Sequence, residues 1–238
     1  MINLKNRILA SIRARRSRIS PVDIAGVGRG KSILAEGYAL ADQLRKDPDA
    51  LSWSMTGVLP KSRKARLWDG KYKCNAFVQQ GANKVFGDKT ILQHPKLGRT
   101  MSAGEIYDSL ANPTITGKGT KLVPITKDQA NLLPGSIVVS KSSGPSGASG
   151  HVGVTSGFNR NTSISAGSAN GVVENDWGFR PGEDYRYGSF VPSSLNEPAI
   201  QRLIDRRLSL ARKLSAIRTN EGAGKESEIF LRLFGTGK

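Results

Sequence analysis

The sequence predicts an α+β protein, with helices mainly before residue 90 and after residue 195 and with short strands between residues 134 and 191. Apolar residues recur at helical spacing from Ser32 to Arg45 and again after Cys74. From residue 134 to 191, β-branched runs alternate with Gly, Ser and Pro, which is typical of an antiparallel sheet with tight turns. The 238 residues, 37% of them apolar, are enough for one domain with a real core and additional segments.

The N-terminal residues 1–31 form the first predicted unit. Basic and apolar residues alternate from Met1 to Arg18 in the pattern of a basic amphipathic helix, without the uninterrupted apolar core of a signal peptide. This helix could pack on the domain, dock a partner or lie on a membrane surface. The segment from Ala25 to Ser32 resembles a phosphate-binding loop. No buried strand precedes it, so we expect a flexible linker in which Ser32 caps the next helix.

The predicted catalytic domain spans residues 32–195 and contains the elements in a simple order. A helix from Ser32 to Arg45 leads to a loop bearing Trp53, and a second helix begins at Cys74. A long connection is expected from residue 87 to 128, followed by the antiparallel sheet. Residues 196–238 are predicted to be a basic helical extension, and no segment has the unbroken apolar length needed to span a membrane.

Cys74, the single cysteine, lies where a polar turn enters the second helix. A thiol at a helix N-terminus has its thiolate favoured by the helix dipole and by free backbone N–H groups, and Lys71 and Lys73 add positive charge nearby. These features predict a nucleophile, although a lone cysteine is often an inert buried residue. A single cysteine also excludes an internal disulfide and a cysteine-rich zinc site, and nothing in the sequence indicates a metal.

His151 is one of two histidines and lies at the start of a predicted strand, where it would face the preceding elements. A cysteine on a helix and a histidine on a later strand form a nucleophile and general-base pair in many hydrolases. The competing interpretation is a structural or solvent-facing histidine. The other histidine, His94, precedes Pro95 in a polar loop and is expected at the surface.

Three motifs resemble the papain-like cell-wall amidases and endopeptidases of the NlpC and CHAP type. They are Lys73-Cys-Asn-Ala-Phe-Val78, Pro134-Gly-Ser-Ile-Val-Val139 and Gly150-His-Val-Gly-Val154. Trp53 and the segment from Val173 to Arg180 also look like pieces of this group, so the resemblance covers roughly residues 35–192. It implies a nucleophile helix packed on a small antiparallel sheet.

The same resemblance implies the chemistry of an amide hydrolase that needs no metal or organic cofactor. Cys74 would be the nucleophile and His151 the base, with a third polar group orienting the ring. By strand count the third group should come from the segment 162–166, which offers Ser165. The following strand offers Asn175 and Asp176, and these two are preferred. The strand-initial Pro-Gly-Asp that is usual in the family reads Pro-Gly-Ser here.

The function implied is hydrolysis of an amide in the stem peptide or crosslink of peptidoglycan. The chain is also similar to type VI secretion amidase effectors, which implies an antibacterial toxin with a cognate immunity protein. The alternative route is a phage tail or related injection particle. In either case we expect the protein to be made in the cytoplasm and to act in the periplasm or cell wall of a target bacterium, after delivery or lysis.

The formal charge of +17, from 36 basic and 19 acidic residues, predicts an anionic partner. Acidic cell-wall polymers satisfy this expectation. The absence of an aromatic-interleaved basic motif or a zinc-finger pattern argues against nucleic acid. Two alternatives remain open. One is a papain-like acyl hydrolase or transferase acting on a non-wall substrate, and the other is a basic nucleic-acid-binding or structural particle protein.

Overall fold

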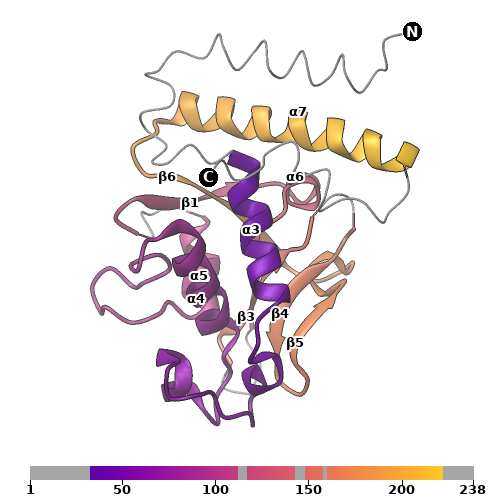
Figure 1. Cartoon of the computed structure of the whole chain (residues 1–238). Helices are drawn as coiled ribbons and strands as arrows, with labels where there is room; N and C mark the ends of the chain where they lie inside the picture. The colour runs from indigo at the N-terminus through magenta and orange to yellow at the C-terminus, as the bar shows by residue number, and fades with distance from the viewer. Residues whose placement is uncertain (1–32, 112–116, 143–147, 158–159, 222–238) are drawn as a thin grey trace, which may run out of the picture.

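The protein is built on one six-stranded antiparallel sheet with helices on both faces, as the computed structural model shows (Figure 1). The structure describes residues 33–111, 117–142, 148–157 and 160–221. The predicted α+β class is confirmed. The expected N-terminal basic helix, the glycine-rich segment that resembles a phosphate loop and the end of the C-terminal extension lie outside the described residues.

The elements follow one another with short connections. The helices are α3 (Ile33–Arg45), α4 (Cys74–Phe86), α5 (Ala103–Ser109), α6 (Lys127–Leu132) and α7 (Glu197–Glu221), with 3₁₀ turns η1 (Ala50–Trp53), η2 (Lys64–Trp68) and η3 (Trp177–Phe179). The strands are β1 (Thr120–Ile125), β2 (Ile137–Lys141), β3 (Gly150–Thr155), β4 (Ser163–Gly167), β5 (Gly171–Asn175) and β6 (Tyr185–Pro192).

The strand order across the sheet is β1-β6-β2-β3-β4-β5. Strand β3 lies near the centre, where Ser140 of β2 pairs with His151 and Gly153 pairs with Ser165 of β4. Side chains two apart on a strand point to the same face, so His151 and Gly153 share one face of the sheet. Residues of three neighbouring strands therefore meet around His151.

One face of the sheet is covered by α3, α4 and α5, and this layer holds the largest apolar core. Phe77 and Val78 of α4 are buried against inward-facing residues of β3 and β4 such as Val152 and Ile164. The indole of Trp53 contacts the Phe77 ring edge-on, with centroids 5.0 Å apart. This burial holds the first turn of α4, and therefore Cys74, against β3.

The other face is covered by α6, η3 and α7, with α7 lying across the β1 and β6 end of the sheet (Figure 1). Ile204 and Leu208 of α7 pack against Val191 of β6. Arg207 is 8% exposed and donates to the hydroxyl of Ser189 and to the carbonyl of Phe190, each at 2.8 Å. The first part of the expected C-terminal extension is thus a helix that shares a core with the sheet.

The long connection expected from residue 87 to 128 contains a helix and a strand. Ser102 and Glu105 form a reciprocal capping box that begins α5. Residues 120–125 form the edge strand β1, in which Pro124 is tolerated because an edge strand does not need every N–H for pairing. Neither α5 nor β1 was predicted from the sequence within this connection.

Helix α3 approaches the turn before β2 very closely at Gly37. A Cβ atom at this position would lie 2.1 Å from the carbonyl oxygen of Pro134, and Gly135 on the other side adopts φ +77°. The backbone of a turn cannot move away as a flexible side chain could. Glycine at position 37 is therefore required by the packing of α3 on the turn that starts β2.

We expect Gly37→Ala to lower the free energy of unfolding by about 1–3 kcal/mol, because the added methyl group overpacks a backbone contact. Urea denaturation followed by circular dichroism measures this change. Ala39→Ser, at an exposed position of the same helix, is the control and should be close to neutral. A Gly37→Ala protein as stable as wild type would mean that α3 does not approach the turn this closely.

Candidate active site

Cys74 and His151 line the same cavity, which has a volume of about 430 Å³. Cys74 comes from the first turn of α4, and His151 from the start of β3. The wall is completed by residues of β2, β4, β5 and η3 and by small or hydroxyl-bearing side chains such as Ser140, Ala166 and Ser168. The structure therefore brings the two sequence-predicted residues into one concave site.

The thiol of Cys74 is almost completely enclosed, with 4% of the residue exposed. This burial raises the pKa of the thiol above 9.0, because a thiolate is poorly solvated there. Backbone hydrogen bonds from Val152, Asn75 and Cys74 itself act in the opposite direction but are outweighed. The expectation of a thiolate favoured in the resting protein was wrong, because desolvation exceeds the help from the helix N-terminus.

Lys73 does not supply positive charge to the thiol. Its side chain is fully buried, and Nζ donates to the backbone carbonyls of Ser52, Ser54 and Gly57 at 3.3, 2.7 and 2.6 Å. Nζ also lies 3.6 Å from the carboxylate of Asp69. Lys73 thus holds the 52–57 loop against the start of α4. The prediction that Lys73 supplies positive charge beside the sulfur is wrong.

The imidazole of His151 is held between a hydroxyl and an indole. Its Nε2 lies 3.0 Å from Oγ of Ser165, and the ring of Trp177 meets it edge-on with centroids 4.4 Å apart. Burial lowers the pKa of His151 from 6.5 to about 4, so the ring is neutral at pH 7. With Nε2 occupied by Ser165, Nδ1 is the nitrogen that remains for a proton transfer.

Among the three candidates for the orienting group, Ser165 is the one that contacts the ring. Asn175 lines the cavity, but its side-chain oxygen accepts the backbone N–H of Trp177 at 3.0 Å. Asp176 pairs with Arg180 at 3.1 Å and is two-thirds exposed. The preferred candidates therefore lie at the turn that places Trp177, and the less favoured Ser165 lies beside Nε2 of the imidazole.

Space for Ser165 beside the histidine depends on Gly153. A Cβ atom at position 153 would lie 2.9 Å from the carbonyl oxygen of Ile164 and 3.0 Å from Cβ of Ser165. The second glycine of the Gly-His-Val-Gly motif is therefore required by the close packing of β3 on β4. A side chain there would push β4 and its serine away from His151.

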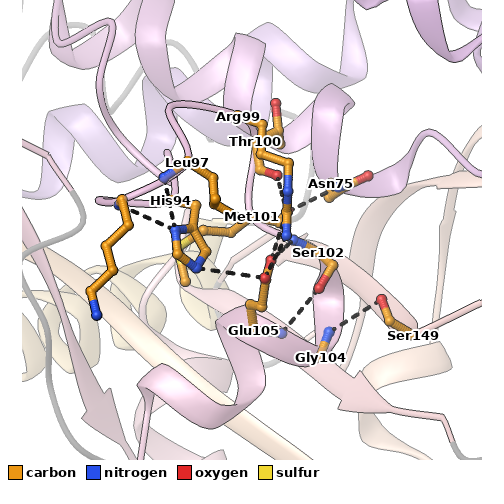
Figure 2. A network of polar contacts seen from close by, with 11 residues as sticks. Asn75, His94, Leu97, Arg99, Thr100, Met101, Ser102, Gly104, Glu105 and Ser149 are labelled. Atoms are coloured by element: carbon orange, nitrogen blue, oxygen red, sulfur yellow. Dashed lines mark hydrogen bonds and ion pairs between the residues drawn. The ribbon is translucent and has the colours of Figure 1, made fainter.

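A network of polar contacts surrounds the turn before α5 (Figure 2). Its centre is Glu105, which accepts two hydrogen bonds from Arg99 at 2.9 and 2.7 Å and one from the backbone N–H of Ser102 at 2.7 Å. His94, expected at the surface, is half-buried at its edge, with Nε2 3.8 Å from Glu105. These contacts hold the turn before α5 in one shape.

The network contacts the chain next to Cys74 and the chain just before His151. Asn75, the residue after Cys74, donates from its side-chain amide to the carbonyl of Met101 at 2.9 Å. On the other side, the backbone N–H of Gly104 donates to Oγ of Ser149 at 3.4 Å, two residues before His151 (Figure 2). We call this set, comprising Asn75, Arg99, Met101, Ser102, Gly104, Glu105 and Ser149, the α5 brace.

Sequence reasoning missed the brace and the contact of Trp177 with His151. The spacing of Ser102 and Glu105 was a readable capping-box signal, since Ser followed three residues later by Glu marks a helix start. Trp177 belonged to a segment that was identified as resembling the family but was given no role. Nothing in the sequence indicated that Asn75 would reach Met101, because that contact depends on how the chain folds back.

Within the described ranges, no group of three or more His, Cys, Asp or Glu side chains could hold a metal ion. The same part of the chain contains no helix with the length and apolar character needed to cross a membrane. No protein-family model matches the chain. Searches of curated proteins and of solved structures likewise found no match.

We expect alkylation of Cys74 to follow a pKa higher in the folded protein than in the unfolded chain, because burial disfavours the thiolate. With one cysteine in the sequence, a single iodoacetamide adduct in the intact mass reports this residue alone. Rates measured against pH in buffer and in urea give the two values. A lower pKa in the folded protein would contradict the buried, neutral thiol.

Glu105 should make the stability of the fold sensitive to acid. Its hydrogen bonds from Arg99 lower the pKa of this carboxyl from 4.5 to about 2, so its stabilising effect is complete above pH 4.5 and is lost as the pH falls toward 2. We expect Glu105→Gln to cost about 1 kcal/mol at pH 7. The gap in thermal midpoint from wild type should shrink below pH 4.5, and a gap independent of pH would contradict this role.

Proposed function

We propose that this protein is a cysteine amidase or endopeptidase that cleaves an amide bond in the stem peptide or crosslink of peptidoglycan. The observation that supports it best is the shared cavity of Cys74 and His151, in which Ser165 holds the imidazole by Nε2. A thiol, a neutral base and an orienting group within one cavity are the parts that nucleophilic amide hydrolysis requires. The resemblance of the motifs to the NlpC and CHAP enzymes adds the substrate class.

In this proposal the resting pair is a neutral thiol and a neutral imidazole. Nδ1 of His151 takes the thiol proton while sulfur attacks the carbonyl carbon, a C–S bond forms and the carbonyl oxygen becomes an oxyanion. Backbone N–H groups in the first turn of α4 have no partner within the helix, and they would stabilise that oxyanion. When the intermediate collapses, the C–N bond breaks and the amine leaves with the proton from His151.

The second half of the reaction returns the enzyme to its starting state. His151 takes a proton from water, the resulting hydroxide attacks the thioester, and the C–S bond breaks to release a carboxylic acid. The sulfur leaves as thiolate and recovers its proton from His151. Ser165 keeps the ring in the tautomer that carries its proton on Nε2, so Nδ1 is ready to accept.

The charge of the chain fits a wall substrate. The formal charge of +17 attracts the chain to the acidic polymers of a bacterial envelope. As part of the same proposal, the enzyme is an antibacterial effector, or a lysin carried by a phage or injection particle, that acts on the wall of a target cell. A cognate immunity protein would be the partner of an effector.

Purified peptidoglycan sacculi test the activity directly. Sacculi of several chemotypes are incubated under reducing conditions with wild type, Cys74→Ala and His151→Ala, and the released muropeptides are identified by mass spectrometry. We expect new fragments with wild type only, and the fragment masses identify the bond that is cut. No fragments from any chemotype would overturn the proposed wall substrate.

Ser165→Ala should lower kcat by about fivefold to tenfold, the loss expected for one neutral hydrogen bond of about 1 kcal/mol. KM should change little, because Ser165 touches the ring of His151 and is 1% exposed. On the acid side of the pH profile, kcat/KM should decrease with a midpoint near pH 4, because His151 gains a proton there and can no longer act as a base. An unchanged kcat in Ser165→Ala would argue against its orienting role.

A further inference from the structure

The α5 brace includes Asn75, which follows Cys74, and Ser149, which lies two residues before His151. Cys74 is the first residue of α4 and His151 is the second residue of β3, two elements that lie far apart in the sequence but in direct contact. Apolar packing sets the distance between their axes. It does not by itself fix the first residue of each element to the precision of a proton transfer.

The nucleophile end of the brace is the side chain of Asn75. This residue is 5% exposed, and its amide donates to the carbonyl of Met101 at 2.9 Å. Met101 is followed directly by Ser102, whose hydroxyl and backbone N–H both pair with Glu105 in the capping box. The residue next to Cys74 is therefore joined to the rigid first turn of α5.

The histidine end of the brace is the contact of that first turn with Ser149. Gly104 donates to Oγ of Ser149, and a Cβ atom on Gly104 would lie 3.0 Å from the Ser149 carbonyl oxygen. Figure 2 shows the α5 turn between Asn75 on one side and Ser149 on the other. From Ser149 the chain continues through Gly150 to His151.

We propose that Asn75 is a positioning residue which, through the first turn of α5, fixes the thiol of Cys74 relative to the imidazole of His151. This inference rests on the proposed function, since it assumes that the two residues work as a pair. Arg99 and Glu105 give the brace its stiffness by two charged hydrogen bonds, which are stronger than neutral ones. No part of the brace touches the substrate in this scheme.

Gln79 provides a matched control on the same helix. Its side-chain amide donates to the carbonyl of Ile91 at 3.0 Å, and its side-chain oxygen accepts from the hydroxyl of Thr100, so it also ties α4 to the chain that leads to α5. It lies about one turn farther from the nucleophile. Loss of Gln79 and loss of Asn75 each remove an amide-to-carbonyl bond from α4, but only Asn75 lies beside Cys74.

The test measures the rate of Cys74 alkylation by iodoacetamide at pH 7, with Asn75→Ala and Gln79→Ala each placed in wild-type and His151→Ala backgrounds. We expect Asn75→Ala to slow alkylation by about tenfold in the wild-type background. It should have no further effect once His151 is absent, because no pair is then left to align. Gln79→Ala should stay within about twofold of wild type.

Two outcomes would overturn the inference: an equal effect of Asn75→Ala with and without His151, or an equal loss in Gln79→Ala. If Asn75→Ala does not fold, Ser149→Ala at an exposed position tests the other end. A slower rate that depends on His151 supports the brace, and an unchanged rate overturns it. His151→Ala alone tests the proposed pair, since alkylation as fast as wild type in that variant would contradict the Cys–His mechanism itself.

Discussion

The packing of the first turn of α4 on strand β3 is the contact on which the site depends. Phe77 and Val78 are 1% and 0% exposed and drive this contact through burial of apolar surface. The same contact encloses the sulfur of Cys74 and brings it to the backbone N–H of Val152, the residue after His151. Stability and the proposed chemistry are thus coupled in one place, because the helix and the strand that pack in the core also carry Cys74 and His151.

This coupling explains why the site is neutral at rest. The sulfur is buried and the imidazole is partly buried, and the loss of solvation favours the uncharged form of each. A charged pair would require solvation that the core does not provide. The contacts of the imidazole are neutral as well, namely the hydroxyl of Ser165 and the ring of Trp177.

Much of the fold could be predicted from the sequence because its signals are local. The periodicity of α3 and α4, and the β-branched runs of β2 and β3, depend on residues that lie next to one another in the chain. Strand β1 was missed because Lys121 and Pro124 interrupt the apolar pattern, and it is stable only as the edge partner of β6. Helix α5 has seven residues, too few for a clear helical period.

The candidate site likewise contains residues with local sequence signals and residues whose positions depend on tertiary structure. Cys74 and His151 could be proposed as a pair from their neighbours in the sequence, whereas the group beside the imidazole depends on the register between β3 and β4. That register pairs Gly153 with Ser165 and Thr155 with Ser163, and a shift of one residue would have turned Ser165 away from the ring. The direction of the Lys73 side chain is also a tertiary property, because its carbonyl partners lie 16 to 21 residues earlier in the chain.

Burial of the sole cysteine affects how readily its sulfur is oxidised. Peroxide and disulfide reagents react with thiolates, so a thiol that is buried and protonated at neutral pH is a poor target for oxidation. The chain also has no second cysteine with which an internal disulfide could form. Burial of the sulfur therefore slows its oxidation relative to that of an exposed thiol with an ordinary pKa.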